Sequence, residues 1–407
     1  MSFPLTGFRV IDLGDEATVL ASRLLADLGA DVVRIEDAAG DAVRKRGPFV
    51  GDIAGIERGE AHLLYNAGKR SLALALEREG AWDIVANLAA RADVVIAPLE
   101  KRPLAATFFD ETRLSAANSN VGIVDAVFRR HAPGEIATDL IGTAAGGLLV
   151  LNGYPEDPPN RPAGQLAYKQ LSLAAALGAV SMILERALSG TGGRITVSMQ
   201  EAVMWTTIQS ANENYWHWHE SRPTRRGLGN LGGQTIFEAK DGLSVSVYQH
   251  PPAWSYFVDW VAEALDEHRF AASEWDDQLY RYENQDQITA VTTTLCKTMS
   301  RDELVAEGQR RQILVVPVQT VTDIAKDPHL RERRFFQDVW FDQFSANLEM
   351  MRPPLVSSAY ESHARPAPAL GQHSREVLSE LGGLDEARIE ALVREGTVRV
   401  WTKGEEQ

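Results

Sequence analysis

Two stretches near the start of the chain decide the fold: Pro4-Leu5-Thr6-Gly7-Phe8-Arg9-Val10-Ile11-Asp12-Leu13 and Leu24-Leu25-Ala26-Asp27-Leu28-Gly29-Ala30-Asp31-Val32-Val33-Arg34-Ile35-Glu36. Residues 8–13 and 31–35 are short β-branched runs that predict strands. Between them, residues 18–28 have the apolar spacing of a helix, and Gly29 is placed to end it. A strand, a helix and a second strand in this order predict parallel pairing.

The same unit recurs along the first hundred residues. Residues 71–76 and 93–97 predict strands, and residues 81–90 predict a helix between them. The first turn, residues 14–17, lacks the Gly-x-Gly-x-x-Gly fingerprint of a dinucleotide site. The sequence therefore predicts an α/β fold with a Rossmann-like large domain built on a parallel sheet.

The longest predicted helix covers residues 166–188, and a strand is expected at residues 194–198. Beyond residue 221 the character changes, because a turn-rich basic stretch is followed by a β-hairpin pattern over residues 235–248 and by helical patterns. We therefore expect a smaller α+β domain at residues 222–325. It would be inserted between residues 1–221 and 326–407 of the large domain.

Composition excludes some classes of protein. The chain has 407 residues, is 44% hydrophobic and carries a formal net charge of −15, which disfavours nucleic acid as a partner. Its single cysteine, Cys296, excludes an internal disulfide and fits a reducing compartment. The spacing around Cys296 predicts a buried helical position rather than a nucleophile.

No membrane role is expected. The first residues show no basic segment followed by an apolar stretch, and no run approaches the roughly 18 apolar residues of a membrane span. We therefore expect a cytoplasmic protein.

Several motifs match one known family. Together with the opening stretches they resemble the class III CoA-transferases of the CaiB/BaiF and formyl-CoA transferase type. The motifs are Gly40-Asp41-Ala42-Val43-Arg44, Asn66-Ala67-Gly68-Lys69-Arg70-Ser71, residues 184–202 and the tail Arg365-Pro366-Ala367-Pro368-Ala369-Leu370-Gly371-Gln372-His373-Ser374. The resemblance implies the large and small domains described above, and a dimer whose two chains interlock.

The resemblance also implies a chemistry that one residue contradicts. Family members use an aspartate that attacks an acyl-CoA thioester, and the resulting anhydride is reopened by CoA. Counted back from Gly178, the position of that aspartate is Tyr168. A phenol is mostly protonated at neutral pH and its ester is a poorer acyl donor than an anhydride, so direct transfer through Tyr168 is not expected.

Other positions also depart from the family pattern. The family loop Asn-Phe-Arg-Pro-Gly, which lies against CoA, corresponds to residues 98–102, and the second Asn of the Asn-x-Asn-Lys motif is Gly68. The histidine–aspartate pair of the racemase branch is Thr138-Asp139, which disfavours racemase chemistry.

Four polar residues remain as candidates for contact with CoA: Arg44, Asn66, Lys69 and Arg70. Arg and Lys suit the phosphates of an adenine nucleotide. The alternatives are solvated loop charges or contacts with the second chain. Asp139 is a further candidate for catalysis, paired with Glu135 on one helical face, but a cap of the helix that begins at Leu140 is favoured.

Two segments allow other interpretations. Residues 214–220, Asn-Tyr-Trp-His-Trp-His-Glu, contain a His-x-His pattern, but no further ligand motif lies nearby, so no metal is expected. With Trp205, Trp254 and Trp260 these aromatic residues could line an acyl pocket, although core packing is favoured. Residues 227–233 spell Gly-x-Gly-x-x-Gly in the wrong context for a nucleotide and predict a loop.

Three hypotheses follow. The favoured one is the Asp-lacking subunit of a heteromeric acyl-CoA:carboxylate CoA-transferase, acting on acyl-CoA or a carboxylate with a homologous chain as partner. The second is a stand-alone enzyme that uses Tyr168 in acid/base chemistry on an acyl-CoA or related ester, as a lyase, hydratase or hydrolase. The third is a non-catalytic acyl-CoA-binding or scaffold protein.

Overall fold

The computed structural model describes residues 2–101, 108–109, 118–130, 135, 137–207, 229–230, 233–248 and 253–404. The chain divides into two compact units. Unit 1 comprises Met1–Val150, Arg161–Pro223 and Arg334–Gln407, and unit 2 comprises Leu151–Asn160 and Thr224–Arg333.

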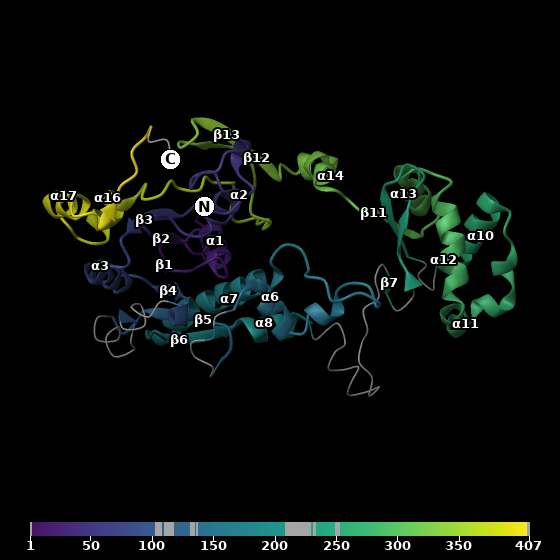
Figure 1. Ribbon diagram of the computed structural model, residues 1–407, viewed down its shortest axis with the longest axis horizontal. Coiled ribbons are helices and arrows are strands. Elements are labelled where there is room, and N and C mark those ends of the chain that lie inside the picture. The colour runs from purple at the N-terminus through teal and green to yellow at the C-terminus, as the bar shows by residue number, and fades with distance from the viewer. Residues whose placement is uncertain are drawn as a thin grey trace. The chain divides into compact units, whose positions relative to one another are not determined.

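Unit 1 is built on a sheet whose described strands run in the order β14-β3-β2-β1-β4-β5-β6 (Figure 1). The first six strands of the chain pair in parallel, and β14 alone among the described strands of this sheet pairs antiparallel, with β3. The parallel sheet predicted from the alternating pattern is thus confirmed. Its strands are β1 (Arg9–Asp12), β2 (Asp31–Asp37), β3 (Arg70–Leu74), β4 (Val94–Ala97), β5 (Gly122–Val127), β6 (Gly193–Ser198) and β14 (Val398–Arg399).

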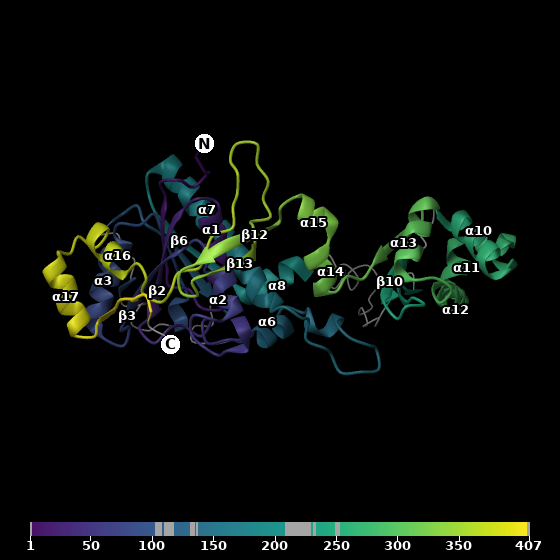
Figure 2. The ribbon, with the colours of Figure 1, turned by 90° about the horizontal axis from the view of Figure 1, so that it is seen from above.

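Helices cover both faces of this sheet because its central strands are apolar on both sides. One face buries Ile11 and Val33 against α3, α16 and α17, and the other buries Val10 and Val32 against α1 and α7. Figure 2 shows α3, α16 and α17 together on one side of the strands. The helices of unit 1 are α1 (Val19–Asp27), α2 (Glu60–Tyr65), α3 (Glu79–Ala89), α6 (Asp139–Ala145), α7 (Leu166–Ser189), α8 (Met199–Thr207), α16 (Ser374–Glu380) and α17 (Glu386–Arg394).

The strand order reverses beside β1, which has β2 on one side and β4 on the other. In open α/β sheets, ligands bind at such a reversal, outside the carboxyl ends of the strands. The loop after Asp12 and the loop after Ala97 lie at this position. Gly29 follows α1 with φ of +96°, so a left-handed residue lets the chain turn into β2, as its placement predicted.

Helix α7 is the longest helix of the described residues, and it packs against α1 and β5. It is long and apolar enough to cross a membrane by length and composition, which corrects the expectation that no run approaches that length. The core helix of a soluble protein passes the same test, so this observation is weak. One face of α7 is buried in the sheet core, at Ala175, Ala179 and Met182.

Unit 2 has its own core, in which Trp254, Phe257, Trp260 and Cys296 are buried. A three-stranded sheet in the order β11-β10-β9 includes the hairpin expected at residues 235–248. Cys296 ends α12 and is buried, as its helical spacing predicted. The elements are β9 (Ile236–Glu238), β10 (Ser244–Tyr248), β11 (Leu314–Pro317), α10 (Trp254–Leu265), α11 (Gln278–Glu283), α12 (Gln285–Cys296), α13 (Arg301–Arg310), α14 (Val321–Lys326) and α15 (Pro328–Glu332).

Two small antiparallel pairs complete the described strands. In unit 1, β12 (Phe336–Phe341) pairs with β13 (Ala346–Met351). In unit 2, β7 (Gly229–Asn230) pairs with β8 (Gly233–Gln234).

Candidate functional site

Arg44 lies in the interior of unit 1 and is fully buried. Its Nε and Nη2 each donate to Glu36 at 2.7 Å, and its Nη1 donates to Glu57 at 2.8 Å. Nη2 also donates to the carbonyl of Pro368 at 3.1 Å. Burial works to lower the pKa of Arg44, but the carboxylates of Glu36 and Glu57 outweigh it and the pKa is raised. The guanidinium therefore joins segments from both ends of the chain.

Lys69 and Asn66 belong to a second part of this buried network. The Lys69 Nζ donates to Asp12 at 3.1 Å, to Asn66 at 2.8 Å and to the carbonyl of Val19 at 2.9 Å. Burial lowers the pKa of Lys69 to about 8, although Asp12 opposes the shift. All three ammonium donors are thus committed within the protein.

His62 connects the two parts of the network. It lies 3.0 Å from Arg44 Nη1 and 2.9 Å from Asn66 Nδ2. Burial, with Arg44 beside it, holds the pKa of His62 well below its usual value, so the imidazole stays neutral. The structure therefore brings Arg44, Asn66 and Lys69 together, but around buried acids.

Arg70 lies apart from that network, at the start of β3. Its Nη2 donates to Asp31 at 2.6 Å and its Nη1 to Glu376 on α16 at 2.9 Å. The contact of all four residues with CoA stays a prediction, since no described feature tests it. The charged groups of Arg44, Lys69 and Arg70 each donate to a carboxylate of this chain, whereas Asn66 contacts Lys69 and His62.

Tyr168 lies in the first turn of α7 and is partly buried against an apolar cluster that includes Leu171. Burial raises the pKa of its hydroxyl, and the nearby carboxylates of Asp15 and Glu16 raise it further. The phenol is therefore held in its neutral, protonated form well above neutral pH.

Asp139 lies at the same helix start as Tyr168. Its Oδ1 accepts from the backbone N–H of Ala167 at 3.0 Å and of Tyr168 at 3.3 Å, and its Oδ2 accepts from Arg161 Nε at 3.1 Å. It is 3% exposed. The carboxylate satisfies N–H groups that have no partner within α7 and complements the positive end of that helix.

The sequence predicted that Asp139 caps the helix beginning at Leu140, and this prediction is wrong. Helix α6 begins at Asp139 itself, and Thr138 is its cap, accepting from the N–H of Ile141 at 3.5 Å. Asp139 instead caps α7, which begins 27 residues later in the chain. Its neighbour in the sequence pattern, Glu135, pairs with Arg129 at 3.4 Å.

The carboxyl ends of β1, β4 and β5 meet near Tyr168. A small cavity there is lined by Asp15 from the loop after β1, Lys101 from the loop after β4 and Phe128 from the end of β5. Lys101 donates to Asp15 at 2.6 Å, which joins the first two loops. Leu171, on the next turn of α7 after Tyr168, also lines this cavity. Tyr168 packs against the cluster that contains Phe128 and Leu171, so the predicted position of the nucleophile lies beside this crevice, although Tyr168 itself does not line the cavity.

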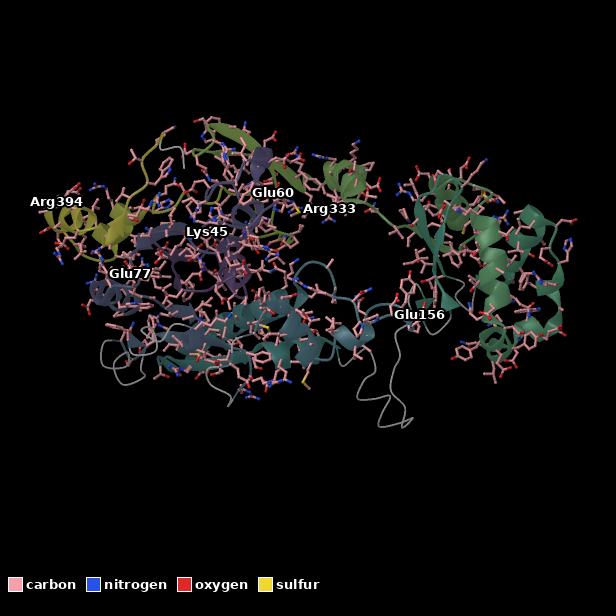
Figure 3. The ribbon with its side chains drawn as sticks, in the orientation of Figure 1. Lys45, Glu60, Glu77, Glu156, Arg333 and Arg394 are labelled. Atoms are coloured by element: carbon pink, nitrogen blue, oxygen red, sulfur yellow. The ribbon has the colours of Figure 1, made fainter. Side chains whose placement is uncertain are left out.

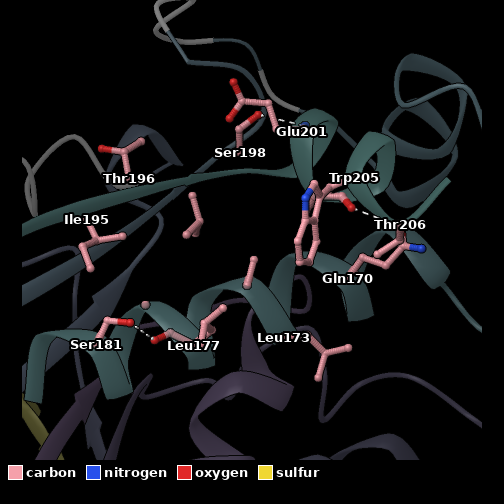
Figure 4. A pocket seen from close by; sticks show the side chains of 14 residues that line it. Gln170, Leu173, Leu177, Ser181, Ile195, Thr196, Ser198, Glu201, Trp205 and Thr206 are labelled. Carbon is pink, nitrogen blue, oxygen red and sulfur yellow. Dashed lines mark hydrogen bonds between the residues drawn. The ribbon is translucent and has the colours of Figure 1, made fainter. Parts of the chain in front are cut away.

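A second, larger cavity lies between α7, β6 and α8 (Figure 4). It is mostly apolar, with Leu173 and Leu177 from α7, Ile195 from β6 and Trp205 from α8 among its lining residues. Figure 4 shows the Trp205 ring extending from α8 toward Gln170 on α7. Trp205 is 77% exposed, which is unusual for a tryptophan.

The aromatic residues considered in the sequence analysis differ in their burial. Trp254 and Trp260 are buried in the core of unit 2, whereas Trp205 is exposed on α8. Residues 214–220 lie outside the described residues. Within the described part of the chain, no group of three or more His, Cys, Asp or Glu side chains is arranged to hold a metal.

Comparison with known proteins decides the family. The family model described as CoA-transferase family III matches residues 5–374. The chain belongs to CoA-transferase family III.

Curated relatives cover nearly the whole chain. It is 29% identical to the succinyl-CoA:(R)-benzylsuccinate CoA-transferase subunit BbsE of Thauera aromatica, over 96% of this chain and 97% of the relative. It is 27% identical to the succinyl-CoA:mesaconate CoA-transferase of Haloarcula hispanica, over 95% and 99%. It is 25% identical to the formyl-CoA:oxalate CoA-transferase of Shigella sonnei, over 95% and 97%.

A solved structure agrees on the fold. A CAIB/BAIF family protein from Brucella suis superimposes with a TM-score of 0.79 and 24% identity, covering 94% of this chain and all of that chain. The family III fold expected from the motifs is thereby confirmed. Family members act on acyl-CoA and carboxylates.

Proposed function

We propose that this chain is the Asp-lacking subunit of a heteromeric acyl-CoA:carboxylate CoA-transferase. The covalent step would take place in a homologous chain that carries the aspartate. The relative from Thauera aromatica supports this proposal, because it is itself named as one subunit of a CoA-transferase.

The observation that carries the proposal is the chemistry at the start of α7. Tyr168 stands where the family motif would place the aspartate, and its raised pKa keeps the phenol protonated. A protonated phenol is a weak nucleophile, and a carboxylate is needed as both nucleophile and leaving group. Tyr168 therefore cannot replace the aspartate in acyl transfer.

The acids near Tyr168 are already committed to other groups. Asp139 is buried and accepts hydrogen bonds from two backbone N–H groups and from Arg161. Attack by its carboxylate would break those bonds, each worth about 1.5–3 kcal/mol when charge is involved. Asp15 is paired with Lys101 at 2.6 Å, and Glu16 lies 3.8 Å from Arg46.

An exposed apolar stripe on α7 supports the proposal that this chain has a partner chain. Its residues follow helical spacing and are exposed by 36–78%. They are Leu173, Leu177, Val180, Leu184 and Leu188. With Trp205 they form the α7 stripe, a surface of the kind that marks a protein interface. We propose that a homologous chain covers it, in an interlocked dimer within the cytoplasm.

We keep the remaining expectations as parts of this proposal. Residues 222–325 would form the small domain. Arg44, Asn66, Lys69 and Arg70 would act at the CoA site, and their burial among acids favours an indirect role in which they hold the loops that contact CoA.

The test uses the chain together with a homologous chain that carries aspartate at the position of Tyr168. The chain alone should show no transfer from succinyl-CoA to carboxylates, and the purified pair should be active. Replacing the partner chain's aspartate by alanine should lower the rate by at least about 10³-fold, as expected for loss of a nucleophile. Tyr168→Phe should leave the rate of the pair unchanged. Turnover by this chain alone would refute the proposal.

The raised pKa of Tyr168 also favours a second candidate function. A phenol that stays protonated can donate a proton or a hydrogen bond to a developing oxyanion, so the chain alone could catalyse acid/base chemistry on an acyl-CoA. In that case Tyr168→Phe would abolish activity while acyl-CoA affinity remained. Unchanged turnover in Tyr168→Phe would reject it.

A further inference from the structure

A cavity of about 360 Å³ in unit 1 is lined mainly by polar and basic residues. Three cationic side chains contribute to its wall: Arg46, Arg161 and Lys169. They come from the loop before α2, from the segment before α7 and from α7 itself. Tyr65 and Gln165 add polar groups, and no acidic residue is among the lining residues. We call this space the basic pocket.

The cations of the basic pocket exceed the acids that contact them. Arg46 lies 3.8 Å from Glu16, and Arg161 is bound to Asp139. Lys169 forms no ion pair with any residue that the structure describes. Among the described residues, three cations against two carboxylates leave a local charge of +1. An excess of positive charge in a cavity attracts an anion.

The Lys169 ammonium group lies close to the backbone that precedes α7. Gly164 has φ of +84°, and a Cβ added at that glycine would lie 3.3 Å from the Lys169 Nζ. The ammonium group is therefore folded back over the chain that precedes α7. Arg46 and Arg161 are 40% and 48% exposed, so an entering ligand can reach both guanidinium groups.

The basic pocket is connected to the start of α7 through Asp139, which accepts from Arg161 of the pocket wall at 3.1 Å and from the backbone N–H of Tyr168 at 3.3 Å. Tyr168 itself does not line the pocket. An oxyanion in the pocket would meet two guanidinium groups and one ammonium group. Guanidinium groups bind carboxylate and phosphate through paired hydrogen bonds, and an ammonium group adds a point charge.

We propose that the basic pocket binds an oxyanion of the substrate, through Arg46, Arg161 and Lys169. The inference rests on the proposed function, since it takes the ligand from acyl-CoA or its carboxylate acceptor. The ligand class is a small carboxylic acid with a carboxylate free to enter the pocket, or a phosphate of CoA. The connection through Asp139 to the start of α7 favours the carboxylate.

Isothermal titration calorimetry on the full chain tests the pocket directly. The probes are succinate, inorganic phosphate, CoA and 3′-dephospho-CoA, each titrated at low and moderate salt. The variants are Lys169→Gln and Arg46→Gln. The matched control is Lys45→Gln, at a residue that Figure 3 labels. It removes the same charge from an exposed side chain that precedes Arg46 in the sequence and is not among the pocket's lining residues.

We expect succinate to bind the unaltered chain and to bind each pocket variant on the order of tenfold more weakly, as for loss of one charge-assisted hydrogen bond. The control should stay within about twofold, since it changes only the long-range field. If the pocket variants bind only phosphate more weakly, or bind CoA but not 3′-dephospho-CoA more weakly, the result would also support the pocket and would assign a phosphate as its ligand.

The proposal is refuted if no probe binds saturably, or if the pocket variants and Lys45→Gln bind the probes with the same affinity. Circular dichroism on each variant verifies that the fold is retained. The readout is binding and is therefore independent of turnover. If the pair of chains transfers CoA while Lys169→Gln and Arg46→Gln bind every probe normally, the proposed pocket is refuted and the proposed function is not.

Discussion

The carboxylate of Asp139 accepts a hydrogen bond from the backbone N–H of Tyr168 at 3.3 Å. This contact joins the two residues that the sequence predicts as candidates for catalysis, and through it Asp139 fixes the backbone of Tyr168. Asp139 holds the first turn of α7, and that turn sets where the phenol of Tyr168 lies.

Asp139→Ala should loosen the start of α7. The change removes the partner of two backbone N–H groups and of Arg161, so the free energy of unfolding should fall by about 1–3 kcal/mol. Urea unfolding measures it. Glu135→Ala is the control: among the described residues Glu135 pairs with Arg129, both side chains are exposed, and the loss of such a pair should lower the free energy of unfolding much less. An equal loss of free energy of unfolding in the two variants would contradict the conclusion that Asp139 caps α7.

Arg44→Met should destabilise the fold rather than merely weaken CoA binding. It leaves Glu36, which is fully buried, without its charge partner, and breaking a buried pair costs about 3–5 kcal/mol. Lys45→Met, at the exposed neighbouring position, should unfold like the unaltered chain. If Arg44→Met kept its stability and lost only CoA affinity, Arg44 would instead be a ligand contact.

Stability should fall in acid because of Glu36. Burial alone would raise its pKa, but Arg44 outweighs burial and lowers the pKa to about 2, against an ordinary value of 4.5. The carboxylate therefore stabilises the fold fully above pH 4.5, and this stabilisation is lost as the pH falls toward 2.

Ser71→Ala tests this pH dependence. The Ser71 hydroxyl donates to Glu36 at 2.8 Å, so its removal should bring the pKa of Glu36 nearer to the ordinary value. The variant should unfold in acid at a higher pH than the unaltered chain, as followed by tryptophan fluorescence. An acid transition at unchanged pH would show that Glu36 does not control it.

Leu177→Glu should prevent assembly with the homologous chain. Leu177 is 64% exposed in the α7 stripe, and a charge there would have to be buried in the interface. Leu279→Glu is the matched control, since Leu279 is 62% exposed on α11 of unit 2. Size-exclusion chromatography of the mixed chains separates the outcomes. Assembly that tolerates Leu177→Glu would place the interface elsewhere.

Much of the fold could be predicted because its signals are local. The β-branched runs around Val10 and Val32, and the helical spacing between them, depend only on neighbouring residues. The same holds for α7 and for the buried helical place of Cys296. Motif spacing then indicated the family, which the family model confirmed.

The candidate site could be predicted only in part. Counting along a helix assigns Tyr168 to the position of the family aspartate without any knowledge of contacts, and this assignment stays a prediction. Arg161 and Lys169 were missed, because their only signal is a shared cavity with Arg46, more than a hundred residues away in the chain. The role of Asp139 was misassigned for the same reason, since the helix it caps is distant in sequence.

The sequence by itself determined the alternating strands and helices around β1 and β2, the long helix α7 and the family, since each follows from residue types and their spacing. Only the tertiary structure decided the charge partners. Arg44 meets Glu36, Glu57 and the carbonyl of Pro368, which the chain brings together from segments up to 324 residues apart. Such pairing depends on which side chains share a space without water, and spacing along the chain does not encode that.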